Sequence, residues 1–140
     1  MKSKDRNTLI SYRFERSQEA LNAAELLFKN NMLTSSMNRI YYAMFYAVQA
    51  LLLVTGASFS KHGQVKGYFN KEYIKTGIFP KEFGKLYNEV FDYRQKFDYV
   101  DLKVPTEFIV NNYLKKSANF VNKVKDYVNP ICATNRSLDE

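Results

Sequence analysis

Arg94 and Asp98 are the residues whose types and spacing most directly indicate chemistry. They lie four residues apart, so on a helix their side chains can face each other. Both continue an apolar helical stripe that begins at Phe83, and a buried guanidinium needs a partner such as Asp98. In one interpretation Asp98 orients Arg94 toward a phosphate, with Tyr99 beside it, because the planar guanidinium donates two parallel hydrogen bonds. In the other, which the pattern alone favours, the pair is a salt bridge that closes the end of a helical bundle.

Four further residues could complete such a site. Arg39 and Tyr42 share a helical stripe that is polar and aromatic together, which suits a polar groove shared with Arg94 and suits a dimer interface better. His62 is the single histidine, and its ordinary pKa near neutrality would let it act as a general acid or base. Lys61 precedes it and could attract phosphate. The ordinary alternative is an exposed histidine at a helix start with no special role.

Composition narrows the classes of function. The chain has 140 residues and a formal charge of +7, which favours anionic partners, although a solvated basic surface explains the charge equally well. The single cysteine, Cys132, excludes an internal disulfide, and one histidine with one cysteine cannot form the usual structural zinc site. We expect no metal and no cofactor. Glycine-rich phosphate loops and serine nucleophile motifs are absent. The sequence has no signal peptide and no membrane-spanning apolar run, which predicts a cytoplasmic protein without membrane contact.

Helical periodicity recurs in five segments, at about residues 8–29, 35–55, 61–75, 80–98 and 105–128. Thr34 or Ser35 is expected to cap the second segment, and Pro130 to end the fifth. Short connections between four long helices imply antiparallel neighbours. The predicted fold is therefore an all-α, up-and-down bundle of four long helices plus a short connecting helix. It forms a single domain over residues 1–130, followed by a polar C-terminal tail at 131–140.

Four features follow one another along the chain: Arg39-Ile40-Tyr41-Tyr42-Ala43-Met44-Phe45, Gly56, Lys61-His62-Gly63 and Arg94-Gln95-Lys96-Phe97-Asp98-Tyr99. Their order and spacing resemble a bacterial and archaeal branch of the HEPN proteins, over about residues 14–128. The resemblance implies a four- or five-helix bundle that usually dimerises, with a site in the cleft where two subunits meet. Many HEPN proteins are metal-independent RNases, often the toxin of a toxin–antitoxin pair whose partner is commonly a minimal nucleotidyltransferase.

The chain departs from the family at one catalytic position. The family signature is an Arg followed a few residues later by a His. Arg94 matches the Arg, but Tyr99 stands where the His would fit, and His62 upstream is the only replacement. General acid–base help is worth about 10²–10⁴-fold in rate, so its source matters.

We therefore expect a HEPN-type homodimer that binds RNA or a nucleotide. Arg94, Arg39 and Lys61 would contact the ligand, Asp98 would orient Arg94, and Tyr42 and Tyr99 would stack or form hydrogen bonds. RNA cleavage through His62 is an extension of this hypothesis. The alternatives are a non-catalytic module that docks a minimal nucleotidyltransferase, and an inert structural dimer with a salt bridge.

Overall fold

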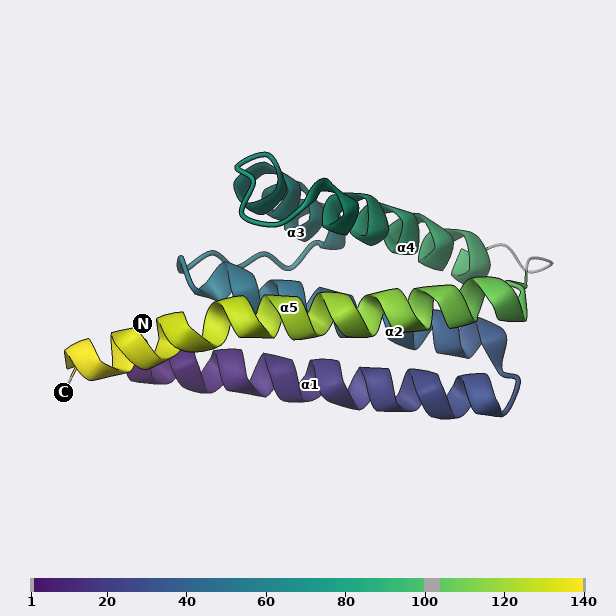
Figure 1. Cartoon of the computed structure of the whole chain (residues 1–140), viewed down its shortest axis with the longest axis horizontal. Coiled ribbons are helices and arrows are strands. Elements are labelled where there is room, and N and C mark those ends of the chain that lie inside the picture. The colour runs from purple at the N-terminus through teal and green to yellow at the C-terminus, as the bar shows by residue number, and fades with distance from the viewer. Residues whose placement is uncertain (1, 100–103, 140) are drawn as a thin grey trace.

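The computed structural model describes residues 2–99 and 104–139, and their side chains except those of residues 97–99 and 135–139. The chain is an all-α bundle, as predicted. Four long helices run alternately in opposite directions, and a short helical segment precedes the third of them (Figure 1). The elements are α1 (Ser3–Lys29), α2 (Leu33–Leu53), α3 (His62–Phe69), the π-helical turn η1 (Asn70–Ile74), α4 (Lys81–Tyr99) and α5 (Glu107–Asp139).

The second helix, α2, is the centre of the bundle, because α1, α3, α4 and α5 all pack against it. A helix can be surrounded in this way only if apolar residues cover most of its circumference. That condition holds from Ile40 to Leu53, where every residue except Tyr42, Tyr46 and Gln49 is buried. These three lie on the polar and aromatic stripe and are half-buried. The core therefore leaves one narrow face of α2 whose polar and aromatic side chains are not used in apolar packing alone.

Glycine and asparagine occupy the turns that need a left-handed backbone. Gly56 and Gly77 have φ of 79° and 80°, and Asn31 has φ of 58° at the end of α1. The predicted cap of α2 is wrong: the helix begins at Leu33 and has no side-chain cap. The Met32 N–H donates to the Leu27 carbonyl at 2.9 Å, which ties the start of α2 to the last turn of α1.

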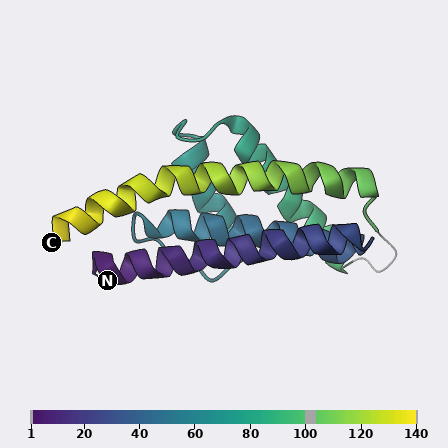
Figure 2. The same ribbon diagram turned by 60° about the horizontal axis from the view of Figure 1, so that its bottom comes forward.

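The predicted end of the last helix at Pro130 is also wrong, because α5 continues to Asp139 with Pro130 inside it. Val128 and Cys132, on either side of the proline, are both buried. The Asn7 amide donates to the Cys132 carbonyl at 3.1 Å, which ties this part of α5 to α1. Tertiary contacts thus outweigh the missing proline N–H, and α5 curves toward α1 over its last turns (Figure 2). Residues 131–139 are helical and not an irregular tail.

The connecting helix changes geometry halfway. The α-helix α3 ends at Phe69 and the π-helical turn η1 follows directly, which periodicity did not predict. The Asn70 amide nitrogen donates to the Lys66 carbonyl at 3.1 Å and to Asn88 Oδ1 of α4 at 3.0 Å. Gly84 of α4 is buried against this turn. The π-helical turn therefore locks the connection onto α4.

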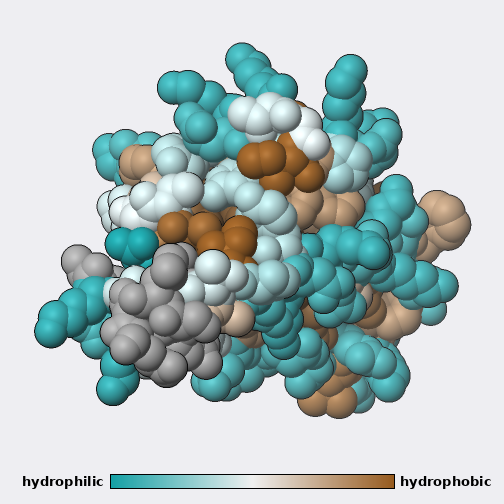
Figure 3. Space-filling view, turned by 60° about the vertical axis from the view of Figure 1, so that its left-hand side comes forward, coloured by the Kyte–Doolittle hydropathy of each residue, from teal (hydrophilic) through white to brown (hydrophobic). Residues whose placement is uncertain are grey.

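The outer surface has a different character from the core. On the face shown in Figure 3, hydrophilic residues cover much of the surface and hydrophobic residues are exposed in small patches. Within the described residues, no helix has the length and apolar character needed to cross a bilayer.

Substituting Gly84→Ala should destabilise the fold. A Cβ at this position would lie 3.0 Å from Asn70 Oδ1 and 3.1 Å from Ile74 Cγ2, and Asn70 is held by its hydrogen bonds. Overpacking of about 1–3 kcal/mol, offset by about 1 kcal/mol from the better helix propensity of alanine, should lower the free energy of unfolding by up to about 2 kcal/mol. Urea denaturation measures this change. Gly67→Ala in α3 is the control, because a Cβ there meets nothing within 4 Å; equal effects of the two substitutions would contradict the packing argument.

Candidate functional site

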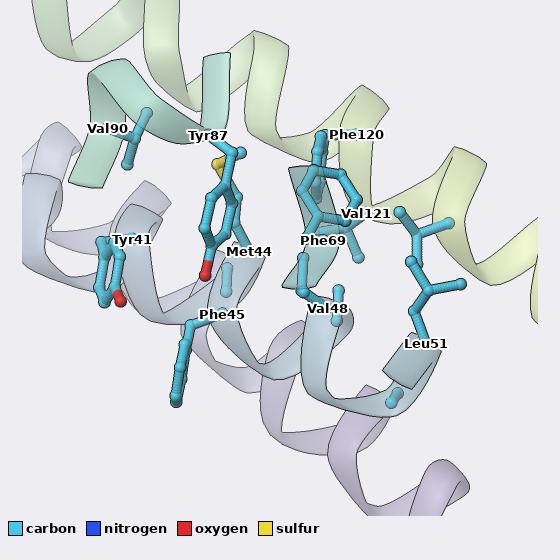
Figure 4. Packing of buried hydrophobic residues seen from close by; sticks show 14 of the residues in the cluster. Tyr41, Met44, Phe45, Val48, Leu51, Phe69, Tyr87, Val90, Phe120 and Val121 are labelled. Atoms are coloured by element: carbon cyan, nitrogen blue, oxygen red, sulfur yellow. The ribbon is translucent and has the colours of Figure 1, made fainter. Parts of the chain in front are cut away.

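The site is built around Tyr41, which is fully buried where α2 meets α3 and α4. Figure 4 shows Tyr41 with Phe45 and Tyr87 in the packed core. A buried hydroxyl without a partner costs about 1–3 kcal/mol. The Tyr41 hydroxyl meets this requirement with His62 Nδ1, at 2.8 Å. Burial raises the pKa of Tyr41 well above its ordinary value, while the Tyr87 hydroxyl and the Arg94 charge act in the opposite direction. Tyr41 is therefore a neutral phenol that orients His62.

His62 lies at the first position of α3 and is half-buried against α2. Its ring stacks on Phe45, with centroids 4.2 Å apart and planes at 21°, and meets Tyr42 edge-on at 5.8 Å. Burial lowers the pKa of His62, and the positive charge of Arg94 lowers it further. The imidazole is therefore neutral at neutral pH, which is the form that can accept a proton.

Arg94 reaches the same two tyrosines from α4. Its Nη2 donates to the Tyr42 hydroxyl at 3.3 Å. Its guanidinium carbon lies 5.1 Å from the Tyr41 ring centroid and 5.4 Å from that of Tyr42, within the range of cation–π attraction. His62 and Arg94, far apart in the sequence, thus both contact Tyr41 and Tyr42. A neutral base and a fixed cation next to it are groups that promote attack at a phosphate.

Arg39 belongs to the same group of side chains. Its guanidinium carbon lies 4.8 Å from the Tyr42 ring centroid. The position of the guanidinium is fixed by Asn38, whose Oδ1 accepts hydrogen bonds from Nε at 3.1 Å and Nη2 at 2.7 Å. Tyr42 therefore contacts Arg39 and Arg94 together. The structure brings four of the predicted site residues into one cluster: Arg39, Tyr42, His62 and Arg94.

The other predicted residues are not part of this cluster as described. Asp98 and Tyr99 fall in the last turn of α4, and their side chains lie outside the described residues, so the Arg94–Asp98 pair stays a prediction. Lys61 is exposed directly before His62, and its backbone carbonyl accepts hydrogen bonds from the N–H groups of Gln64 and Val65. Among the described side chains its ammonium group contacts none of the cluster.

Sequence reasoning missed three contributors. Tyr41 and Phe45 were given no role in the site, yet both lie in the core and also hold His62. Lys66 follows His62 by one helical turn and places Nζ 4.3 Å from the Phe91 ring centroid, which adds a cation to this end of α3. A tyrosine in an otherwise apolar stripe could have signalled the site, because its hydroxyl needs a polar partner. Of the described residues, no three His, Cys, Asp or Glu side chains form a group that could hold a metal ion.

Comparison with known proteins finds a matching family model and several similar proteins. A family model described as HEPN domain matches residues 10–127, a range that includes the whole cluster. A UPF0332 protein of Thermotoga maritima is 43% identical over 124 residues, which cover 89% of this chain and 94% of that protein. Two proteins of Methanocaldococcus jannaschii, each named "putative toxin", are 37% identical over 115 residues and 30% identical over 123 residues. These alignments cover 81% and 88% of this chain, and 78% and 91% of the two proteins.

The pKa of His62 should lie below its ordinary value of 6.5, and Arg94→Gln should raise it part of the way back. Burial remains as the larger cause after the charge of Arg94 is removed. Because the unfolded chain binds a proton below pH 6.5 and the folded chain binds it only at lower pH, the free energy of unfolding should fall as the pH drops through that range. The chain has one histidine, so an NMR titration of its imidazole protons gives the pKa directly. A value at or above 6.5 would contradict this account.

Proposed function

Because the chain belongs to the HEPN domain family, we propose that it binds RNA and cleaves it without a metal ion, with His62 as the general base. The observation that carries this proposal is the shared contact of His62 and Arg94 with Tyr41 and Tyr42. In this proposal His62 replaces the histidine that the family signature has after the Arg, although His62 lies in a different part of the sequence. The lowered pKa of His62 supports the role of a base at neutral pH.

The proposed reaction uses the 2′-hydroxyl of the RNA as the nucleophile. His62 accepts the proton of this hydroxyl while the 2′ oxygen attacks the adjacent phosphorus. The bond from phosphorus to the 5′ oxygen breaks, and that oxygen takes a proton from water. The products are a 2′,3′-cyclic phosphate and a 5′-hydroxyl end. Arg94 stabilises the negative charge that develops on the phosphoryl oxygens, and Arg39 binds the phosphate group, since planar guanidinium groups match phosphate oxygens.

The proposed biological setting follows from the names of similar proteins and from the family. The similar proteins named as toxins support the proposal that this chain is the toxin of a toxin–antitoxin pair, acting in the cytoplasm. We also propose that it forms a homodimer, which is the assembly that the family resemblance implies. A minimal nucleotidyltransferase is the partner class that the family implies.

Cleavage of a mixed RNA pool, with chelator present and no added metal, tests the reaction. Wild-type protein should cleave. His62→Ala should reduce the rate by about 10²–10⁴-fold through loss of the base, and Arg94→Ala by about 10²–10³-fold through loss of charge stabilisation. Lys125→Ala, which removes an exposed charge from α5, is the matched control and should leave the rate unchanged. Circular dichroism establishes that each variant is folded.

Two other results would change the conclusion. Wild-type protein that binds RNA but does not cleave it would retain the binding role and remove the nuclease role. Wild-type protein that neither binds nor cleaves RNA would overturn the proposal and favour the docking module or the inert dimer. In the inert case, Arg94→Ala should lower the stability of the fold and change no binding.

A further inference from the structure

We infer that the hollow between Arg16 and Arg39, on the face formed by α1 and α2, is a second phosphate-binding subsite for single-stranded RNA. It would bind the backbone of nucleotides next to the one held at His62 and Arg94. This inference rests on the proposed RNA-binding function and extends it to the length and strandedness of the ligand.

The hollow has walls of arginine and tyrosine and a floor of alanine. It measures about 250 Å³ and is lined by Arg16, Glu19, Ala20, Ala23, Arg39 and Tyr46. The alanines belong to α1. Because their side chains are small, a space remains between the longer side chains of α1 and α2 that line the hollow. Ala20 is buried and Ala23 is half-buried, so the floor is closed. A group that enters the hollow therefore meets guanidinium groups at its sides.

Arg16 is held in place by Tyr46 as Arg39 is held by Tyr42. Its Nη2 donates to the Tyr46 hydroxyl at 3.3 Å, and its guanidinium carbon lies 5.3 Å from the ring centroid. Within the described residues, neither Arg16 nor Arg39 forms an ion pair with a carboxylate. Glu19 also lines the hollow, but one carboxylate against two guanidinium groups leaves a net positive charge. Fixed, unneutralised guanidinium groups are suited to binding phosphate.

The hollow is continuous with the proposed catalytic cluster. Arg39 lines the hollow and also contacts Tyr42, whose ring is in contact with both His62 and Arg94. The Tyr42 and Tyr46 rings are adjacent along α2, with centroids 5.8 Å apart. Beyond them, Tyr12 lies one turn before Arg16 on α1 and is 48% exposed. Cations and aromatic rings thus alternate along one strip of the surface.

The aromatic rings of this strip determine which form of RNA fits. Tyrosine rings and the planes of arginine side chains bind bases by stacking, which requires bases that are splayed out from a helix. In double-stranded RNA the bases are paired and stacked on one another, and such a strip could reach only the backbone. A single strand can place its phosphates at Arg16 and Arg39 while its bases stack on the neighbouring side chains. The ligand class is therefore single-stranded RNA longer than a dinucleotide.

The test compares the binding and cleavage of two fluorescently labelled RNAs by full-length protein. One is a dinucleoside monophosphate, which reaches only the cluster at His62, and the other is a single strand of about ten nucleotides, long enough to follow the strip. Arg16→Ala should weaken binding of the longer RNA on the order of tenfold through loss of a charged hydrogen bond. It should also reduce the slope of log affinity against log salt by about 0.7, the value for one phosphate of a single strand. Its effect on the dinucleotide should be nil.

Two further variants and three possible outcomes make the result decisive. Arg16→Lys keeps the charge without the planar fork and should lose part of the affinity, whereas Lys125→Ala removes one charge elsewhere and should lose none. If Arg94→Ala weakens both RNAs and Arg16→Ala weakens neither, the second subsite is overturned while the proposed function stands. If wild-type protein binds neither RNA, both proposals fail. If Arg16→Ala instead converts a dimer to a monomer in sedimentation analysis, the strip is an interface between copies of the chain, and the subsite is overturned.

Discussion

The hydroxyl group of Tyr41 is the constraint on which this structure most depends. The ring completes the core around α2, but burial leaves its hydroxyl without water, and a buried polar group needs a hydrogen-bonding partner. His62 Nδ1 provides that partner and thereby fixes where α3 begins against α2. The start of α3 in turn determines where η1 and α4 follow, so a requirement of the core sets the position of the only histidine in the chain.

Tyr41, together with Tyr42, also explains how the cation Arg94 is tolerated at the end of the apolar stripe of α4. Arg94 follows the buried residues of α4, and it lies against the rings of Tyr41 and Tyr42, where cation–π attraction and one hydrogen bond compensate in part for lost hydration. Its charge, together with burial, keeps His62 neutral. Tyr41 and Tyr42 stabilise the packing and also hold His62 beside Arg94. The same two residues therefore have a structural role and a role in the site.

Sequence periodicity predicted the helices, because burial on one side of a helix repeats with the helical period. It failed at Pro130, at the cap of α2 and at η1, where contacts between distant segments outweigh local preference. For the site, residue types identified Arg39, Tyr42, His62 and Arg94 one by one. The contact of His62 and Arg94 with the same two tyrosines could not be predicted, because the crossing of α2, α3 and α4 is set by packing and leaves no repeat in the sequence. The roles of Asp98 and Tyr99 stay predictions.

A catalytic motif that is defined by spacing along the chain describes one way of meeting a geometric requirement. The requirement is a neutral base and a cation close to the same phosphate, and the chain order of the two groups does not enter into it. In this protein the tyrosines of α2 bring together a base from α3 and a cation from α4. The base that we propose therefore comes from α3 and not from the residues that follow Arg94. The helix α2 positions both groups: its buried stripe places Tyr41 against His62, and its half-buried stripe carries Tyr42 and Tyr46 toward the arginines.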